Sequence, residues 1–240
     1  MAKKQFSRAL LAVGFGLLGL GILPSVDNPT PARALDLGAN SIDNPTSIWV
    51  VVNKARPLNP IKYKPVDLVV PGFGPLNANP YQHSMRRDVA AAAEGLAKSM
   101  QKAGKGRLVI QSAFRSYNTQ KSVHDRQVSR FGLAAGEALA ARPGYSEHQT
   151  GLAIDVSARD QGCQIRVCFG GTKAGAWLKA NAHRWGFIIR YPQNAMPVTG
   201  YQYEPWHLRY VGIELATDMK QKSISTLEKY FGLPSAPKYP

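Results

Sequence analysis

The spacing of apolar residues changes several times along the chain, and it predicts a mixture of helices and short strands. Apolar positions three and four residues apart indicate helices, whereas short alternating or β-branched runs indicate strands. The expected helices cover residues 84–102, 119–131, 134–141, 174–183 and 213–230. The expected strands cover residues 48–52, 107–112, 152–156 and 186–190, with an extended segment over residues 203–210. Because helices and strands are mixed irregularly rather than strictly alternating, the predicted fold class is α+β.

The first 34 residues have the pattern of an export signal rather than of a folded element. Three basic residues precede an uncharged apolar run over residues 9–23, which is shorter than the roughly 20 residues needed to span a bilayer. Ala-Arg-Ala at residues 32–34 supplies a small-x-small cleavage pattern. We therefore expect residues 1–34 to be a signal peptide, and we expect membrane attachment only if this segment is not cleaved.

The remaining chain is expected to form one domain. A length of 240 residues allows one sizeable domain at roughly 100–200 residues per domain. Composition is 44% hydrophobic and 19% charged, as in soluble globular proteins, which excludes disorder throughout, collagen and coiled coil. We predict an exposed lead-in over residues 35–47, a catalytic domain over 48–232 and a frayed tail over 233–240.

The chain is strongly basic, with 30 Lys and Arg against 15 Asp and Glu, a formal charge of +15. Nucleic acid is one partner for such a charge, but no nucleic-acid-binding motif is recognisable, so we do not expect one. An anionic cell wall is a matching target for an exported protein. Positive charge alone also gives solubility and non-specific attraction, so it does not require a partner.

The two cysteines, Cys163 and Cys168, are close enough in sequence to pair in a small loop. Thiols exposed to an oxidising compartment tend to form disulfides, so we expect these two to be joined. A metal site is the weaker alternative, because neither a Cys-x-x-Cys pair nor a nearby histidine completes a tetrahedral ligand set.

Two segments combine imidazole and carboxylate groups. His148 precedes Asp155 across a turn into an apolar strand, and burial of this carboxylate requires a cation or hydrogen-bond donors. Glu204 and His207 form a second pair. Two histidines and an aspartate can bind zinc and leave a position for water, and a glutamate can then act as the base. In a regular strand, residues three apart point to opposite faces, so this pair needs an irregular backbone, for which Pro205 provides a cause.

Arg115 follows the strand predicted over residues 107–112 and is a candidate for gripping a carboxylate with two hydrogen bonds. Each candidate also has an ordinary structural interpretation: a lone histidine is usually a core or surface residue, Asp155 can cap a turn, and Arg115 can form a structural ion pair. Taken from the residues alone, both interpretations stay open. The other histidines lack an acid or a second histidine at ligand-like spacing, and they are interpreted as structural: His83, His124 and His183.

Two partial motifs of serine enzymes are also present. Ser99 and Lys102 match a Ser-x-x-Lys pair, but the accompanying Ser-Asp-Asn and Lys-Thr-Gly motifs are absent. Residues 144–148 resemble a nucleophile elbow without its closing glycine. The His-Glu-x-x-His motif of helical zinc proteases is absent as well. A serine hydrolase is therefore disfavoured.

Several longer runs carry a family resemblance: Val-Asn-Lys at 52–54, Ser-Ala-Phe-Arg-Ser-Tyr at 112–117, Ser-Glu-His-Gln-Thr-Gly-Leu-Ala-Ile-Asp at 146–155, Gly-Phe-Ile-Ile-Arg-Tyr-Pro at 186–192 and Tyr-Glu-Pro-Trp-His-Leu-Arg-Tyr at 203–210. Together they resemble the VanY-type zinc D-alanyl-D-alanine carboxypeptidases over residues 48–212. The resemblance implies the Hedgehog/DD-peptidase fold, a small antiparallel sheet with flanking helices. It also implies one Zn²⁺ per chain, with His148, Asp155 and His207 as ligands and Glu204 as the general base.

The same resemblance implies which residues contact the substrate and what the substrate is. Arg115 would polarise the scissile carbonyl, and Gln120 and Ser146 would contact the peptide, which would be a peptidoglycan stem peptide ending in D-Ala-D-Ala. The expected location is outside a bacterial cytoplasm, secreted or in the cell envelope. Two alternatives stay open: a peptidoglycan endopeptidase of the same fold, and a non-catalytic cell-wall-binding module.

Overall fold

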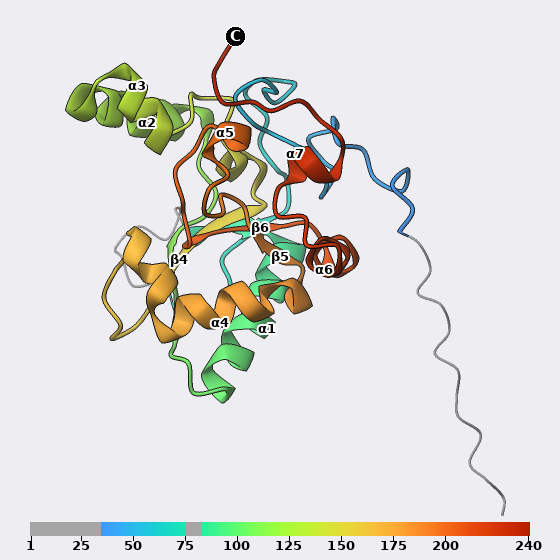
Figure 1. Ribbon diagram of the computed structural model, residues 1–240, viewed down its shortest axis with the longest axis vertical. Helices are drawn as coiled ribbons and strands as arrows, with labels where there is room; N and C mark the ends of the chain where they lie inside the picture. Colours follow the sequence, from blue (N-terminus) through green and yellow to red (C-terminus); the bar gives the residue numbers. More distant parts are fainter. Residues whose placement is uncertain (1–34, 75–82) are drawn as a thin grey trace, which may run out of the picture. The chain divides into compact units, whose positions relative to one another are not determined.

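The computed structural model describes residues 35–74 and 83–240, and an antiparallel sheet of four short strands lies at its centre (Figure 1). Across the sheet the strands run in the order β3 (Leu108–Ser112), β4 (Ala153–Ala158), β6 (His207–Tyr210) and β5 (Phe187–Ile189). A separate two-stranded sheet pairs β1 (Leu68–Val69) with β2 (Met85–Arg86). With its helices, this small antiparallel sheet confirms the predicted α+β class.

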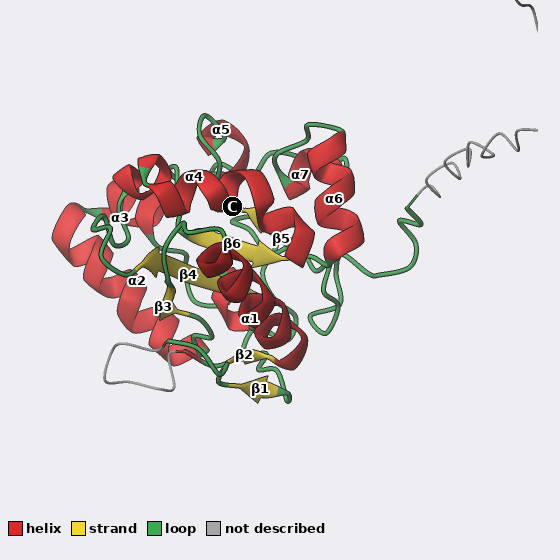
Figure 2. Ribbon diagram, turned by 90° about the horizontal axis from the view of Figure 1, so that it is seen from below, coloured by secondary structure: helices red, strands yellow, loops and turns green. Residues whose placement is uncertain are grey.

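Helices cover the sheet on both sides (Figures 1 and 2). On one side lie α1 (Arg87–Lys102) and α4 (Lys173–Asn181), and toward the other lie α2 (Tyr117–Phe131), α3 (Leu133–Leu139) and α5 (Met196–Thr199). The chain ends with α6 (Ile213–Gln221) and α7 (Leu227–Tyr230). Short 3₁₀ turns connect several of these elements: η2 (Glu147–Thr150), η3 (Val167–Gly171) and η4 (Ala182–Trp185).

The alternation of side chains along the central strands separates the core from the polar face. Ile154, Val156 and Leu208 belong to the main hydrophobic core, together with apolar residues of α1 and α4. Successive strand residues point to opposite faces, so Asp155 and His207 lie on the face away from this core. The period-2 pattern of two apolar strands thus places two ionisable side chains on one surface of the sheet.

Most predicted elements are present, with ends that differ by a few residues. The first four predicted helices correspond to α1, α2, α3 and α4, and the strands at 107–112, 152–156 and 186–190 correspond to β3, β4 and β5. Two helix starts are capped by side chains: the Ser116 hydroxyl accepts from the Thr119 amide at α2, and the Thr172 hydroxyl accepts from the Gly175 amide at α4.

The strand predicted over residues 48–52 is wrong. This segment is largely buried but pairs with no strand. Three of its carbonyls accept from arginine side chains instead: Arg209 Nη2 donates to Ile48 and Val50, at 3.0 and 2.8 Å, and Arg56 Nε donates to Val51 at 3.1 Å. The Val51 amide donates to the Ile42 carbonyl at 2.9 Å. Buried carbonyl groups need a partner, and here guanidinium groups replace a neighbouring strand.

The C-terminal region differs from prediction in two respects. The single helix expected over residues 213–230 is divided into α6 and α7, because Ser223 adopts a left-handed conformation (φ 56°) and Thr226 caps a new helix. The tail expected to fray over residues 233–240 is packed. Ala236 is buried and its amide donates to the Val198 carbonyl at 2.8 Å, while the Tyr239 hydroxyl accepts from the Arg142 amide at 2.8 Å.

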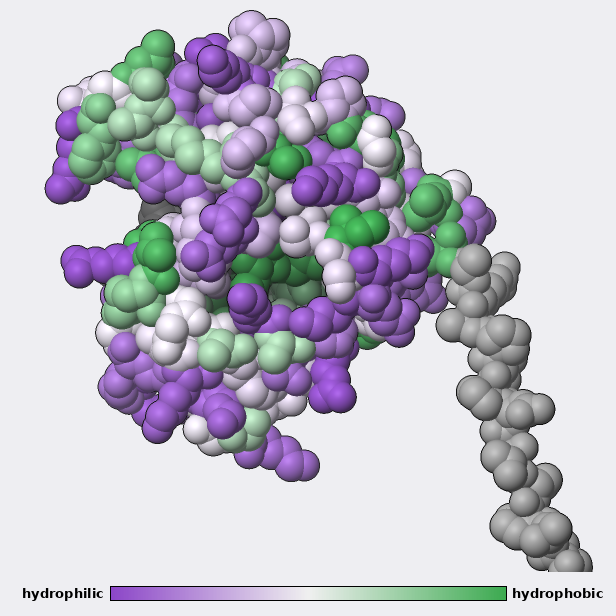
Figure 3. All heavy atoms as spheres, viewed as in Figure 1, coloured by the Kyte–Doolittle hydropathy of each residue, from purple (hydrophilic) through white to green (hydrophobic). Residues whose placement is uncertain are grey.

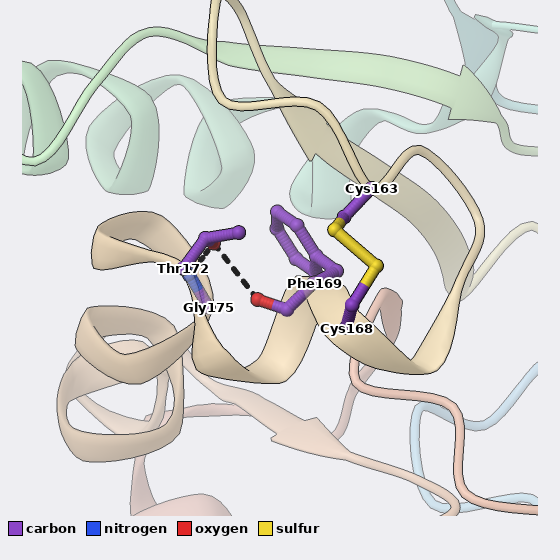
Figure 4. Close-up of a disulfide and its surroundings, with 5 residues drawn as sticks. All are labelled: Cys163, Cys168, Phe169, Thr172 and Gly175. Atoms are coloured by element: carbon purple, nitrogen blue, oxygen red, sulfur yellow. Dashed lines mark hydrogen bonds between the residues drawn. A yellow bond between two sulfur atoms is a disulfide. The ribbon is translucent and has the colours of Figure 1, made fainter.

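A disulfide joins Cys163, in the segment between β4 and η3, to Cys168 of η3 (Figure 4). The predicted signal peptide, residues 1–34, lies outside the described residues. Within residues 35–74 and 83–240, none of the helices has the length and apolar character needed to cross a membrane. Leu35–Pro240 forms one compact unit.

Candidate active site

The fold brings His148, Asp155 and His207 together. Asp155 and His207 are direct partners across β4 and β6, so their side chains share one face of the sheet. His148 is carried by η2, which Gly151 ends in a left-handed conformation (φ 70°) that turns the chain into β4. One ligand atom from each of the three buried residues lies within 4.8 Å of the others. Within residues 35–74 and 83–240, this is the only such group of possible metal ligands.

Hydrogen-bond partners fix the orientation of both imidazole rings. His148 Nδ1 lies 2.6 Å from the Ala113 carbonyl, which can only accept, so Nδ1 carries the proton and Nε2 has the free lone pair. His207 Nε2 lies 3.4 Å from Glu147 Oε2, so its Nδ1 is the free nitrogen. Both free nitrogens point at Asp155, each 3.2 Å from one of its carboxylate oxygens.

The three side chains fit a metal ion. Among the described residues, His148 Nε2 and Asp155 Oδ1 are buried atoms with no hydrogen-bond partner. Buried polar atoms without partners are costly and rare in native proteins, and a shared cation would satisfy both. Two imidazoles and one carboxylate, with no cysteine, form a ligand set that zinc accepts at catalytic sites.

The protonation states around this centre favour a cation. Burial, followed by the charge of Arg115, lowers the pKa of His148 to about 4, so its ring is neutral at pH 7. Burial alone would raise the pKa of Asp155, but both histidines hold it well below its usual range. Burial alone would lower the pKa of His207, yet the adjacent carboxylates of Asp155 and Glu147 raise it to about 9, so without a metal ion the ring itself supplies the positive charge beside Asp155. The carboxylates therefore attract a positive charge, which a bound metal ion would supply.

Glu204 approaches the same centre from a turn that precedes β6. The turn is closed by the His207 amide, which donates to the Glu204 carbonyl at 3.1 Å, and Pro205 and Trp206 occupy its middle. This irregular backbone puts both side chains on one side, with Glu204 Oε2 3.6 Å from His207 Nδ1. Burial raises the pKa of Glu204 to about 8, within the range where a carboxyl group can exchange a proton near neutral pH.

These groups line a pocket of about 270 Å³. Arg115 and Ser146, both predicted to contact substrate, lie in its wall with the three possible ligands and Glu204. The Arg115 side chain is partly exposed to the pocket, and its buried Nε has no hydrogen-bond partner among the described residues. An arginine remains charged even where burial lowers its pKa, so the pocket presents a cation beside the possible metal site.

Gln120 does not lie in this pocket. Its side chain is 1% exposed, and its amide Nε2 donates to the Ala141 carbonyl at 2.7 Å. The predicted contact with the peptide is therefore not supported by its position, because the side chain points into the protein. Gln120 instead supports the backbone of Ala141, which does line the pocket.

A buried network of charged side chains, which contacts His207 through Glu147, was not predicted from the sequence. Glu147 Oε1 accepts from Arg190 Nε and from Arg209 Nη1, both at 2.7 Å. Arg190 also donates two hydrogen bonds to Glu228, at 2.6 and 2.9 Å, and Asn53 donates a third at 3.0 Å. One signal was available in the sequence: Arg190 and Arg209 end or interrupt apolar strand runs, and a charge there needs a buried partner.

A second pocket of about 390 Å³ lies between α4, β5 and α6. Its wall contains Lys179, Lys220 and His183 but no carboxylate. It therefore lacks the mixed set of histidine and carboxylate ligands that a metal centre needs, and the chemistry belongs to the pocket that contains Glu204.

An α+β domain with a buried His-Asp-His set, a neighbouring carboxyl group and an arginine in the same pocket has the features of a metal-dependent hydrolase. The VanY family model, described as D-alanyl-D-alanine carboxypeptidase, matches residues 82–213, which is more than half of the chain. The putative carboxypeptidase YodJ of Bacillus subtilis (strain 168) is 41% identical over 195 residues, which cover 81% of this chain and 70% of YodJ. The chain belongs to the VanY family of carboxypeptidases and is a hydrolase.

Other relatives agree with this assignment. A D-alanyl-D-alanine carboxypeptidase of Enterococcus faecium is 32% identical over 164 residues, which cover 68% of this chain. The chain spans 48% of the length of that relative. Among solved structures, the LdcB LD-carboxypeptidase has a TM-score of 0.73 and 41% identity, over 78% of this chain and 87% of that one.

VanYB in complex with D-alanine-D-alanine has a TM-score of 0.63 and 30% identity, over 76% of this chain and 96% of that one. A VanY D,D-pentapeptidase variant in complex with Zn(II) has a TM-score of 0.62 and 29% identity, over 76% of this chain and 97% of that one. These neighbours confirm the Hedgehog/DD-peptidase fold that the sequence resemblance implies.

Proposed function

We propose that this protein is a zinc carboxypeptidase that releases the terminal D-Ala from peptidoglycan stem peptides ending in D-Ala-D-Ala. Membership of the VanY family and the likeness to VanYB in complex with D-alanine-D-alanine support this substrate class. The single observation that carries the proposal is the convergence of three buried ligand side chains, two of them with unpaired atoms, in the pocket that also contains Glu204 and Arg115.

One zinc ion per chain would be held by His148 Nε2, His207 Nδ1 and an oxygen of Asp155. Zinc at such a site supplies Lewis-acid chemistry, which lowers the pKa of a water ligand and polarises a carbonyl group. The orientation of both rings by Ala113 and Glu147 is part of this proposal, because second partners of ligating histidines fix the tautomer that binds metal.

Glu204 acts as the general base and then as the general acid. Its carboxylate takes a proton from the attacking water and returns it to the amine of the departing D-Ala. Arg115 donates hydrogen bonds to the oxygen of the scissile carbonyl, where negative charge develops in the transition state. Ser146, in the pocket wall, contacts the peptide.

A second candidate activity has a specific observation in its favour. The LdcB LD-carboxypeptidase has 41% identity to this chain, and VanYB has 30%. Cleavage between an L-residue and a terminal D-residue uses the same metal and base, so it requires a change only in how the pocket holds the residue before the scissile bond.

Mass spectrometry of a muropeptide digest tests these activities together. Loss of one D-Ala from peptides ending in D-Ala-D-Ala, abolished by EDTA, is the expected result. Loss of the single D-Ala that follows an L-residue would select the second activity. Release of larger fragments would instead identify an endopeptidase, and retained zinc without any hydrolysis would identify a binding module.

We further propose that the protein acts outside the cytoplasm, secreted or in the cell envelope. The basic and apolar pattern of residues 1–34, the Cys163–Cys168 disulfide and the charge of +15 opposite an anionic wall support export. N-terminal sequencing of the protein recovered from the cell envelope should begin at Leu35. A chain that keeps Met1 would show that the segment is an anchor.

A further inference from the structure

The loop between β4 and η3 has an unusual backbone. Asp160, Cys163 and Ile165 all have positive φ angles, of 66°, 57° and 49°. Positive φ is least expected for a β-branched residue, because its side chain crowds the backbone, so Ile165 is the outlier among them. Such conformations persist where the surrounding structure enforces them, and they gather at sites with a function.

The loop is tied down at several points. The disulfide joins Cys163 to Cys168, and the next residue, Phe169, is fully buried in the main core (Figure 4). On the other side, the Gln161 side chain donates to the Lys105 carbonyl at 2.6 Å and accepts from the Ala174 amide at 3.0 Å. Ile165 therefore sits in a short loop with fixed ends, and its position is imposed on it.

The side chain of Ile165 lines the active-site pocket although it is 42% exposed. Its neighbours in the wall include the apolar side chains of Val123, Leu139 and Trp206. Val167, two residues further along the same loop, is 53% exposed and is not part of the wall. Figure 3 shows the surface hollowed between the side that carries α2 and α3 and the segment that follows β4.

We propose that Ile165 is a substrate-binding residue, an apolar wall against the aliphatic part of the bound peptide, and that the disulfide between Cys163 and Cys168 holds it in position. This inference rests on the proposed peptidase function. An isoleucine has no group that transfers protons or binds metal, so its contribution is to affinity for the peptide. The exposed side chain gains its apolar contact only when substrate covers it, which gives an apolar residue in a strained conformation a role in binding.

The first test compares Ile165→Ala with Val167→Ala, using acetyl-Lys-D-Ala-D-Ala as the probe. Ile165→Ala should raise KM about five- to twenty-fold, because three carbon atoms lose part of their burial against the peptide. The value of kcat and the zinc content should stay as in wild type. Val167→Ala removes a similar apolar group from the same loop outside the pocket, so its KM should not change.

A second set of variants distinguishes an effect of the loop on substrate binding from an effect on protein stability. Ile165→Gly should raise KM as much as Ile165→Ala, yet leave the melting temperature unchanged or higher, because glycine adopts positive φ without cost. The double variant Cys163→Ser, Cys168→Ser should raise KM by a similar factor. Adding Ile165→Ala to that double variant should cause no further rise, since residues that act through one contact are not additive.

Titration calorimetry of the same peptide on each protein distinguishes failure of the inference from failure of the proposed function. Binding that weakens on Ile165→Ala, with no turnover by wild type, would overturn the proposed reaction and support the inference. Turnover with equal KM for Ile165→Ala and Val167→Ala would overturn the inference alone. A loss of kcat together with zinc in Ile165→Ala would also overturn it, because the residue would then support the fold of the site.

Discussion

At the scale of single residues, Glu147 both pairs with buried arginines and orients a histidine of the candidate metal site. Its Oε1 accepts from two buried arginines, while its Oε2 faces His207 Nε2 at 3.4 Å. Burial alone would raise the pKa of the Glu147 carboxyl group, but the charges of both arginines lower it, so the group is ionised. An ionised carboxylate at this point holds the His207 ring with Nδ1 turned to the metal site, so the residue next to one predicted ligand positions another.

Glu147→Gln should therefore weaken zinc binding by about 10- to 100-fold, as is typical when a partner of a ligating histidine is lost. The amide keeps the size of the side chain but can also present a donor to His207 Nε2. Competition with a chromophoric chelator measures the zinc dissociation constant. Glu228→Gln is the matched control, because Glu228 belongs to the same network and makes no contact with His207. Equal zinc affinities for the two variants would show that Glu147 does not position the ligand.

At the scale of elements, Arg209 connects β6 to the buried segment at residues 48–52. One guanidinium group donates to Glu147 and to the carbonyls of Ile48 and Val50. The segment therefore needs no strand partner, and a side chain takes over the role of a β ladder.

Arg209→Met should lower the free energy of unfolding by about 3–5 kcal/mol, because it leaves a buried carboxylate and two buried carbonyls with fewer partners. Urea denaturation of both proteins measures the difference. Lys222→Met is the control, because it removes an ion pair with Asp218 at the protein surface. Surface ion pairs contribute little, so this variant should have nearly the free energy of unfolding of wild type. A similar small change for Arg209→Met would contradict the structural role given to this residue.

Sequence patterns predicted elements whose stability is local. Helices α1 to α4 and strands β3 to β5 follow from apolar spacing along the chain, and the caps at Ser116 and Thr172 that stabilise two of the helices are local as well. The segment at 48–52 has the β-branched composition of a strand, but its partners lie about 160 residues away in sequence, at 161 and 159 positions for its two carbonyl bonds to Arg209. A local pattern contains no information about such a partner.

The candidate site was predictable to a similar extent. The residues made His148, Asp155, Glu204 and His207 candidates, the resemblance to VanY-type enzymes implied their roles, and Pro205 indicated the turn that makes the arrangement possible. Gln120 shows the limit of resemblance, since a family position identifies the residue but not the direction of its side chain. The contribution of Glu147 depends on arginines 43 and 62 residues away, so only the fold reveals it.

At the scale of the whole molecule, two buried ion pairs join distant parts of the chain around Arg190. This residue links Glu147 of η2 to Glu228 of α7. Burial alone would raise the pKa of Glu228, but the charge and hydrogen bonds of Arg190 lower it. A carboxyl group whose pKa is lower in the folded state stabilises the fold above its unfolded pKa, and that stabilisation is lost as the pH falls through the folded value.

The free energy of unfolding should therefore fall as the pH is lowered below about 4.5, the ordinary pKa of the carboxyl group. Glu228→Gln should be less stable than wild type at pH 7 and should show a shallower fall on acidification, because it has no proton to gain there. Urea denaturation between pH 7 and pH 3 measures both slopes, and the metal site is common to the two proteins. Parallel slopes would show that Glu228 does not contribute to the acid sensitivity.

The central claim is that Glu204 carries the proton while His148, Asp155 and His207 hold the zinc. Turnover of zinc-loaded Glu204→Gln on a D-Ala-D-Ala peptide tests it most directly, with the zinc content of the same sample as its control. The amide is nearly the same size but cannot take a proton, so turnover should fall by about 10²- to 10⁴-fold while about one zinc per chain is retained. His207→Ala should instead lose the zinc. A Glu204→Gln protein that keeps its zinc and more than about a tenth of wild-type turnover, far above that range, would contradict the assignment.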